Sequence, residues 1–452
     1  MMRSARLATL GVALLALTPL GVRAQDSTSS VAGRMTDLDR ARVLARTGHT
    51  DDAITAYEQW LTRSPNDADA WRALAAQRRR AGRQGEAIAA LQRASALDSS
   101  ATTRRVVARD IARARTAQRG TIEPRLSGSR DSDGLTTTSA GITVTSPLLG
   151  RARLSASTAA GSAGDGAASR ASQGVTLGVE YRPLAQLRFQ LAGGVSRADR
   201  SFIDTIVTTT PTSSSGSGRG GSRLPIGRPT AVGVSSAESF PVGSARLVWR
   251  EPANAIAVDV RASRQLLEAS PYLVAQGVLR DEASLSLDLR VAGPMRVRGF
   301  GKLGRVHNAD ESNGRQIFGG ALAYAPGAYE VSVRAQTMRY DTATALAYFS
   351  PRSVQTAELT TYFERETDRG ITIAMDLGGG AQQVTEWSSA ASGWSPALHG
   401  WTQVVVPLND TFALGTEIEA YDSRVGSDVR APTVPASRWR YASGIVSLRV
   451  RF

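Results

Sequence analysis

Charged side chains alternate with aliphatic ones along many short segments after Thr121. In the segment 283–290, for example, Leu285, Leu287 and Leu289 alternate with polar residues that include Asp288 and Arg290. Successive side chains of an extended chain point to opposite sides, so such a segment carries all its charges on one face. Interleaved arginines and carboxylates on one face can form cross-strand ion pairs or bind hydroxyl-rich molecules through many weak hydrogen bonds.

The other residue types that support chemistry form no catalytic or metal-binding pattern in the sequence. The chain has no cysteine, which excludes disulfides, thiolate metal sites and cysteine nucleophiles. Its three histidines, His49, His307 and His399, are far apart, and none shares a strand face with a Ser and an Asp. We therefore expect no enzymatic activity, no cofactor and no bound metal. An active site assembled across several strands is the alternative.

Two short motifs have simpler structural interpretations than the chemistry that they suggest. The run Asp131-Ser132-Asp133-Gly134 starts like a calcium loop but lacks the later ligands, so we predict a hairpin turn. Residues 216–221 have the glycine spacing of a dinucleotide-binding fingerprint. They lie in a Ser/Gly-rich stretch without the required strand and helix, so we predict a linker.

The start of the chain has the features of a secretory signal peptide. Arg3 and Arg6 precede an apolar run, and small residues around Ala24 suit cleavage, so we predict a signal peptide over residues 1–24. The formal net charge of +14 is spread along the chain, with 17 arginines against 11 acidic residues in 25–120. No part is basic enough for a nucleic-acid interface, and we expect no nucleic-acid partner.

Residues 31–118 have a helical periodicity that repeats after 34 residues. A 34-residue helix–turn–helix unit with a turn glycine, an alanine and a bulky residue at these spacings resembles the tetratricopeptide repeat. The helix 101–118 would cap the two repeats, and an ordinary helical hairpin domain is the alternative. The residues that we expect to pack the repeats or line their groove are Gly48, Ala53, Tyr57, Trp71, Gly82, Ala87 and Leu91.

From Thr121 the apolar period changes to two, and sixteen strand-like segments follow up to Phe452. Most of their connections alternate between short and long, the long ones including 161–171, 197–242, 264–282 and 340–352. An outer-membrane barrel has short turns on one side and long loops on the other, whereas a sandwich has no such alternation. The predicted fold is therefore α + β, with a helical domain (31–118) followed by an antiparallel transmembrane β-barrel of about sixteen strands (121–452).

Aromatic residues at the ends of the predicted strands agree with a bilayer. They form one set near the short connections and a second near the long ones, as expected for girdles at the two interfaces. The first set is Tyr181, Trp249, Tyr324, Tyr329 and Phe412, and the second is Trp387, Trp394, Trp401, Tyr421 and Trp439. If the apolar face meets lipid, the polar face lines the interior. The interior residues that we predict are Arg246, Arg261, Arg290, Arg296, Arg298, Lys302, Glu330, Arg334, Glu358, Asp376, Glu417 and Glu419.

The layout of repeats followed by a sixteen-stranded barrel resembles the outer-membrane subunits that export exopolysaccharides. The segment 347–352, which includes Tyr348-Phe349-Ser350-Pro351, is similar to a strand start in the barrel of the cellulose-secretion subunit. The resemblance implies an outer-membrane channel for a polysaccharide, with the helices in the periplasm. It also implies as partners the membrane lipid, the barrel assembly machinery and a periplasmic or inner-membrane protein that the repeats dock. This chain has far fewer repeats than those exporters.

Two other functions are compatible with the sequence. The segment 197–242 is long enough to plug the barrel, which would leave an anchor for protein–protein interaction, or it forms an outer loop. Another family with the same layout moves proteins to the cell surface, and the residues do not separate it from polysaccharide export.

Overall fold

The computed structural model describes residues 37–148, 151–166, 168–199, 202–206, 230–234, 237–251, 255–344, 348–367, 369–388, 391–422 and 440–452. The predicted signal peptide, the segment 216–221 and Trp439 lie outside this part of the chain.

The N-terminal region consists of helices arranged in consecutive antiparallel pairs. They are α1 (Asp37–Arg46), α2 (Thr50–Arg63), α3 (Ala68–Arg80), α4 (Gln84–Leu97) and α5 (Ala101–Gln118). Gly48 and Gly82 end the first helix of each pair with φ of 82° and 77°, a backbone conformation that glycine adopts without a steric penalty. At the starts of α3 and α5, the side chains of Asp67 and Ser100 accept hydrogen bonds from the backbone N–H of Ala70 and Thr103. None of the helices in the described residues is long and apolar enough to cross a membrane.

In the described residues from Thr121 onward, sixteen antiparallel strands form a closed barrel, as the alternating pattern predicts. Each strand pairs with its neighbours along the chain, except that β5 pairs with β8, and β1 closes the barrel against β18. The strands are β1 (Thr121–Asp131), β2 (Thr136–Pro147), β3 (Ala152–Gly164), β4 (Ser169–Leu184), β5 (Leu187–Asp199), β8 (Ala237–Arg250), β9 (Ile256–Leu266), β10 (Leu279–Ala292), β11 (Met295–His307), β12 (Ser312–Tyr324), β13 (Tyr329–Tyr340), β14 (Ser353–Glu366), β15 (Thr372–Thr385), β16 (Ser395–Pro407), β17 (Phe412–Tyr421) and β18 (Tyr441–Arg451).

The turns follow the local chemistry of the sequence. Between β1 and β2, the carboxylate of Asp131 accepts hydrogen bonds from the backbone N–H of Asp133 and Leu135, both at 2.9 Å. Gly134 has a φ of 82°, so this motif forms the predicted hairpin turn. The expected long connection 161–171 is wrong, because β3 continues to Gly164 and β4 starts at Ser169. Its small residues still alternate, and cross-strand pairing extends both strands.

The strand register places the aliphatic residues on the outside of the barrel. Leu285, Leu359 and Ile418 are 53%, 56% and 63% exposed, whereas the residues beside them in sequence point to the interior. A closed barrel with an apolar exterior is the architecture of outer-membrane proteins, because lipid covers the exterior and every strand edge is paired.

Of the two predicted aromatic girdles, the first lies on the outer face of the barrel and the second does so only in part. The first set, from Tyr181 to Phe412, is exposed on the outer face near the short turns. In the second set, Trp387 and Trp394 are exposed, but Trp401 and Tyr421 were wrongly assigned. Trp401 is paired with the inward residues Asp376 and Glu419, and Tyr421 stacks on Tyr441 inside the barrel, because both occupy inward positions of their strands. Reading the aromatic type without the register caused this error.

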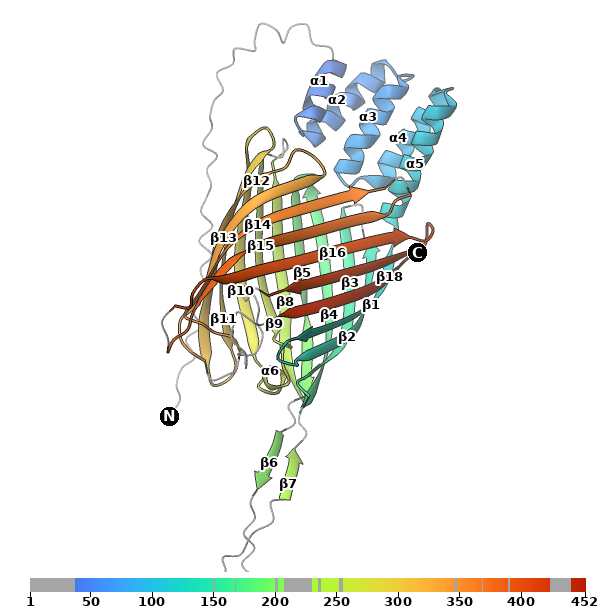
Figure 1. The fold of residues 1–452 in the computed structure, drawn as a ribbon. Coiled ribbons are helices and arrows are strands. Elements are labelled where there is room, and N and C mark those ends of the chain that lie inside the picture. The colour runs from blue at the N-terminus through green and yellow to red at the C-terminus, as the bar shows by residue number, and fades with distance from the viewer. Residues whose placement is uncertain are drawn as a thin grey trace, which may run out of the picture.

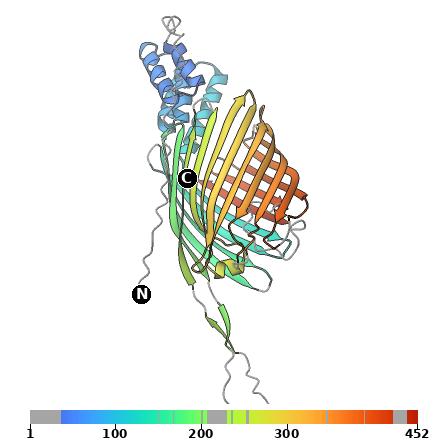
Figure 2. The ribbon, with the colours of Figure 1, turned by 90° about the vertical axis from the view of Figure 1, so that its left-hand side faces the viewer.

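The helices stand at one end of the barrel, and the C-terminus lies at that same end (Figures 1 and 2). Gly120 and Phe452 exchange two backbone hydrogen bonds of 3.1 and 3.0 Å, which join the helix–barrel connection to the last residue. Asp51 of α2 lies 3.6 Å from Arg151 in the β2–β3 turn. The hairpin of β6 (Phe202–Ile206) and β7 (Thr230–Val234) extends beyond the opposite end (Figure 1).

Candidate functional site in the barrel interior

All twelve charged residues that the sequence assigned to the interior lie on the inward face of their strands. On β10 and β11, for example, Asp288 is paired with Arg298 and Arg290 with Arg296, while the outward Leu289 is paired with Val297. The same parity holds around the barrel, where Arg246 is paired with Arg261 and Arg334 with Glu358. The residues that share this face are Arg246, Arg261, Arg290, Arg296, Arg298, Lys302, Glu330, Arg334, Glu358, Asp376, Glu417 and Glu419.

One side of the interior, formed by β5 and β8–β11, is rich in arginine. Arg246 binds Asp259 through its Nε at 3.0 Å, and Asp288 accepts from Arg296 at 2.8 Å and from Arg298 at 3.1 Å. Arg298 also reaches Glu330 on β13, at 2.6 Å between Nη2 and Oε2. Because a charge-assisted fork of this kind has a fixed geometry, these pairs hold the arginine side chains against the wall. We call the inward cations of β5 and β8–β11 the basic arc: Arg188, Arg246, Arg250, Arg261, Arg280, Arg290, Arg296, Arg298 and Lys302.

The opposite side, formed by β14–β17, carries carboxylates. In the described residues, these four strands have no inward arginine or lysine. His399 lies between Glu358 and Asp376, at 3.7 and 3.6 Å, and Trp401 donates its indole N–H to Glu417 at 2.9 Å. We call this set the acidic arc: Glu358, Glu364, Asp376, Glu417 and Glu419.

A glycine makes room for the histidine of the acidic arc. A Cβ on Gly378, which is paired with His399, would lie 2.0 Å from the Cε1 atom of the ring. The close approach of Gly378 therefore allows His399 to lie flat against β15, between the two carboxylates. An imidazole in this place can donate to both carboxylates only when it carries two protons.

The strand order sets the two arcs across the interior from each other. Going round the barrel, β12 and β13 separate them on one side, and β4, β3, β2, β1 and β18 separate them on the other. A solute inside the barrel therefore meets positive charge on one wall and negative charge on the facing wall. The low number of apolar side chains on these inward positions leaves a wall suited to hydrated, polar molecules.

Three inward charges lie beyond the ends of the predicted strands. Arg280 and Glu282 lie on β10, and Arg315 lies on β12 and binds Glu282 at 3.3 Å. The strands start earlier than predicted, at Leu279 rather than 283 and at Ser312 rather than 316. Extending the alternation of Ser284 and Asp288 backwards would have found Arg280 and Glu282, because they have the same parity.

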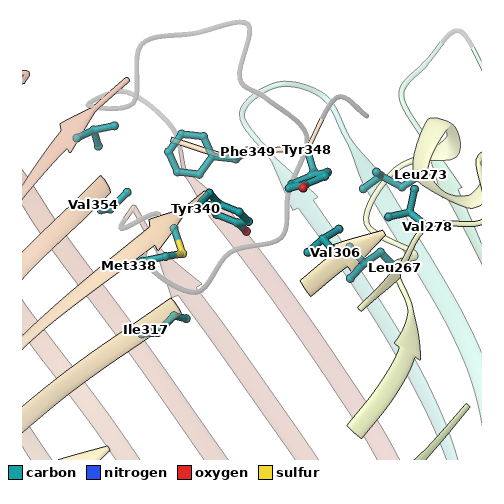
Figure 3. Packing of buried hydrophobic residues seen from close by; sticks show 11 residues of the cluster. Leu267, Leu273, Val278, Val306, Ile317, Met338, Tyr340, Tyr348, Phe349 and Val354 are labelled. Carbon is teal, nitrogen blue, oxygen red and sulfur yellow. The ribbon is translucent and has the colours of Figure 1, made fainter. Parts of the chain in front are cut away.

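The end of the barrel away from the helices is partly covered by two loops. Residues 267–278, which include α6 (Pro271–Ala275), and the pair Tyr348 and Phe349 contribute buried apolar side chains to one cluster (Figure 3). Tyr348 and Phe349 are 2% and 3% exposed and pack on inward residues of the strand ends, such as Met338. Burial raises the pKa of the Tyr348 phenol. These loops cover the barrel mouth, whereas the β6–β7 hairpin of the segment expected as a plug extends away from it (Figure 2).

A cavity of about 370 Å³ lies between the α6 loop and the facing wall of the barrel mouth. Its lining combines hydroxyl and carboxylate groups, including Asp131, with Gln265 and the aromatic pair Tyr421 and Tyr441. The two tyrosine rings stack with their centroids 4.6 Å apart. This lining offers flat apolar faces next to hydrogen-bonding groups.

A second, larger cavity of about 1060 Å³ lies at the other end, between the helices and the barrel rim. Gly82, Arg83 and Glu86 line it from the helical side, and Arg151 and Arg182 line it from the barrel. Asp51 bridges the two parts, because it lies 3.5 Å from Arg83 and 3.6 Å from Arg151. The helical region is therefore held beside the barrel opening by ion pairs as well as by the covalent connection.

Four of the predicted repeat residues are buried in the interior of the helical region, while Gly48 and Gly82 form its turns. Ala53 and Ala87 are fully buried and occupy equivalent places in α2 and α4, and Tyr57 and Leu91 are each 3% exposed. Burial raises the pKa of Tyr57. Trp71 packs against both apolar clusters of the helices. These side chains pack the helices against each other, so a partner would contact the polar faces around them.

The three histidines lie in separate parts of the fold. Their contacts are with carboxylates: His49 with Asp52, His307 with Asp281, and His399 with its two neighbours. In the part of the chain that the structure describes, no hydrogen bond joins a histidine to a serine hydroxyl. No group of three or more His, Asp or Glu residues in that part could hold a metal ion.

A family model matches part of the helical region. The family model for the tetratricopeptide repeat matches residues 36–76. A comparison with curated proteins gives no match. Among solved structures, the chain is similar to a bacterial polysaccharide outer membrane secretin, with 12% identity, a TM-score of 0.47, and coverage of 73% of this chain and 98% of that one.

Other solved structures are similar at the same level. CdiB from Acinetobacter baumannii has 10% identity and a TM-score of 0.40, and the match covers 74% of this chain and 60% of that one. OccK5 from Pseudomonas aeruginosa has 10% identity and a TM-score of 0.35, with coverage of 74% and 98%.

Proposed function

We propose that this chain is an outer-membrane channel through which a polysaccharide or a similar polar polymer passes. The observation that carries the proposal is the pair of facing arcs of opposite charge in the barrel interior. A hydrated polymer can form and break many weak hydrogen bonds as it moves along such a wall. No single arginine would hold it tightly, because arginines such as Arg246 and Arg296 are already paired with carboxylates. An apolar solute would gain nothing from this wall.

The lining of the cavity at the barrel mouth favours a carbohydrate over another polar polymer as the cargo. Sugar rings present an apolar face that stacks on aromatic side chains, and their hydroxyl groups bind carboxylates and amides. The stacked Tyr421 and Tyr441 beside Asp131 and Gln265 offer both kinds of contact. The similarity of the Tyr348-Phe349-Ser350-Pro351 segment to the cellulose-secretion subunit supports the same class of cargo, although this chain has far fewer repeats.

The helical region would lie in the periplasm in this proposal. Both ends of an even-stranded barrel emerge on one side, and the helices stand on that side (Figure 1). The last strand, β18, together with Phe452 after it, would be recognised by the barrel assembly machinery. The repeats would dock a periplasmic or inner-membrane protein that delivers the polymer to the cavity between the helices and the barrel.

Single-channel conductance of the refolded full chain in a planar bilayer tests the channel. We expect stable conductance that neutral oligosaccharides block in proportion to their length. Replacing Arg296, Arg298 and Arg334 with alanine should shift the ion selectivity toward cations and change the residence time of the blocking sugar. The matched control is Arg365→Ala, an exposed outward arginine of β14. Unchanged block and selectivity in the triple variant would contradict the role of the interior.

The coverage of the mouth by two loops favours a second function, a closed barrel that anchors the helices. In that case the channel would be silent, and deletion of residues 31–118 would abolish partner binding while leaving the barrel folded. Export of proteins to the surface is a further alternative. It predicts that an unfolded polypeptide, rather than a sugar, blocks the current.

A further inference from the structure

Arginines interrupt the apolar exterior of the barrel near the end away from the helices. On β11 the outward position after Leu303 is Arg305, and on β13 the outward series of Val333 and Ala335 ends with Arg339. Arg264 occupies the same place on β9. If the aliphatic positions lie in the hydrocarbon core, this row lies at the depth of the lipid headgroups.

A cleft on the outer face adjoins this row. Arg339, Arg352 and Trp387 line it together with Asp341, and its volume is about 510 Å³. Both arginines are exposed. The indole N–H of Trp387 donates to the carbonyl of Ser350 at 2.9 Å, which fixes the ring beside the two guanidinium groups.

Two carboxylates, Asp281 and Asp341, lie among these arginines. Asp281 accepts hydrogen bonds from Arg264 at 2.6 and 2.7 Å and from Arg305 at 3.3 Å, and His307 lies 3.2 Å from it. The single carboxylate of Asp281 therefore accepts hydrogen bonds from both Arg264 and Arg305. In the cleft, the two arginines Arg339 and Arg352 lie with one carboxylate, Asp341, so the lining of the cleft carries a net positive charge.

We propose that this row and its cleft bind the phosphate groups of an anionic glycolipid in the adjacent leaflet. The planar guanidinium fork matches a phosphate bidentately, and Trp387 suits the boundary between headgroup and acyl chain. Directly below the cleft, the outward side chains Phe318 and Leu322 are 48% and 53% exposed and would contact the acyl chains. This apolar wall favours a lipid over free phosphate. The assignment of this site to the leaflet away from the helices depends on the proposed orientation of the barrel in the outer membrane.

Lipid retention by the full chain in neutral detergent, measured by native mass spectrometry, tests this site. The probes are a phosphorylated glycolipid of the lipid A type, its dephosphorylated form, and inorganic phosphate. We expect retention of the phosphorylated lipid to fall at least about tenfold in the double variant Arg339→Gln/Arg352→Gln. The control is Arg365→Gln/Arg369→Gln, which removes two exposed arginines at the other end of the barrel.

Three results would overturn the proposal: equal loss of lipid in both double variants, equal retention of the dephosphorylated lipid, or displacement of the lipid by millimolar phosphate. Heat-modifiable mobility on a gel shows whether each variant still forms the barrel. Conductance is read separately, so a silent channel that loses its lipid only in the Arg339/Arg352 variant refutes the channel and leaves the lipid site standing.

Discussion

Tyr348 and Phe349 pack in the barrel mouth, and truncation of their side chains is expected to open it. Both side chains are almost fully buried, at 2% and 3% exposure, in the cluster that joins the two mouth loops (Figure 3). Truncation of a buried aromatic side chain to alanine costs about 3–5 kcal/mol. The cost falls on the loop rather than on the barrel, because the sixteen strands are paired independently of it.

The expected change in the open fraction can be worked out from the smallest cost of truncating one buried aromatic side chain, about 3 kcal/mol. A loss of about 3 kcal/mol raises the ratio of open to closed loop by about two powers of ten. The double variant Tyr348→Ala/Phe349→Ala should therefore spend most of its time in a state of higher conductance, even if the wild-type mouth is open for about 1% of the time. Planar-bilayer recordings measure this fraction directly.

The matched control is Trp394→Ala, which truncates an aromatic side chain that is 56% exposed in a neighbouring loop. Its effect should stay within about 0.5 kcal/mol, too little to change the open fraction visibly. If the double variant forms a heat-modifiable barrel but conducts like the wild type, the apolar cluster does not control access to the interior.

Three further predictions concern the helices and their attachment. Asp51→Ala removes the bridge to Arg151 and should lower stability by less than about 1 kcal/mol, yet speed proteolytic release of the helices from the barrel. Gly120→Val places a Cβ 2.4 Å from the ring of Phe452 and should slow barrel assembly, seen as less heat-modifiable protein; normal assembly would contradict the contact. Ala87→Leu overfills a fully buried site and should destabilise the helices by about 1–3 kcal/mol in thermal unfolding, with unchanged conductance.

The overall architecture could be predicted because each part of it leaves a local periodic trace. Strands with lipid on one side and polar groups on the other alternate with a period of two, and this pattern gave the sixteen strands and the inward parity of residues such as Arg298 and Glu358. The 34-residue shift likewise predicted that Ala53 and Ala87 occupy equivalent buried places. Strand ends leave a weaker trace in the sequence, because the alternation of apolar and polar residues fades there, so Arg280, Glu282 and Arg315 fall outside the predicted strands.

The tertiary structure alone decided which charges meet and what covers the mouth. The segregation into basic and acidic arcs depends on strand order around a closed barrel, which brings β14–β17 opposite β5 and β8–β11. The orientation of Trp401 depends on register, and the insertion of Tyr348 into the mouth depends on a loop that meets α6 from a distant part of the chain. Local periodicity determines which face a residue occupies, whereas contacts between distant segments arise only when the barrel closes.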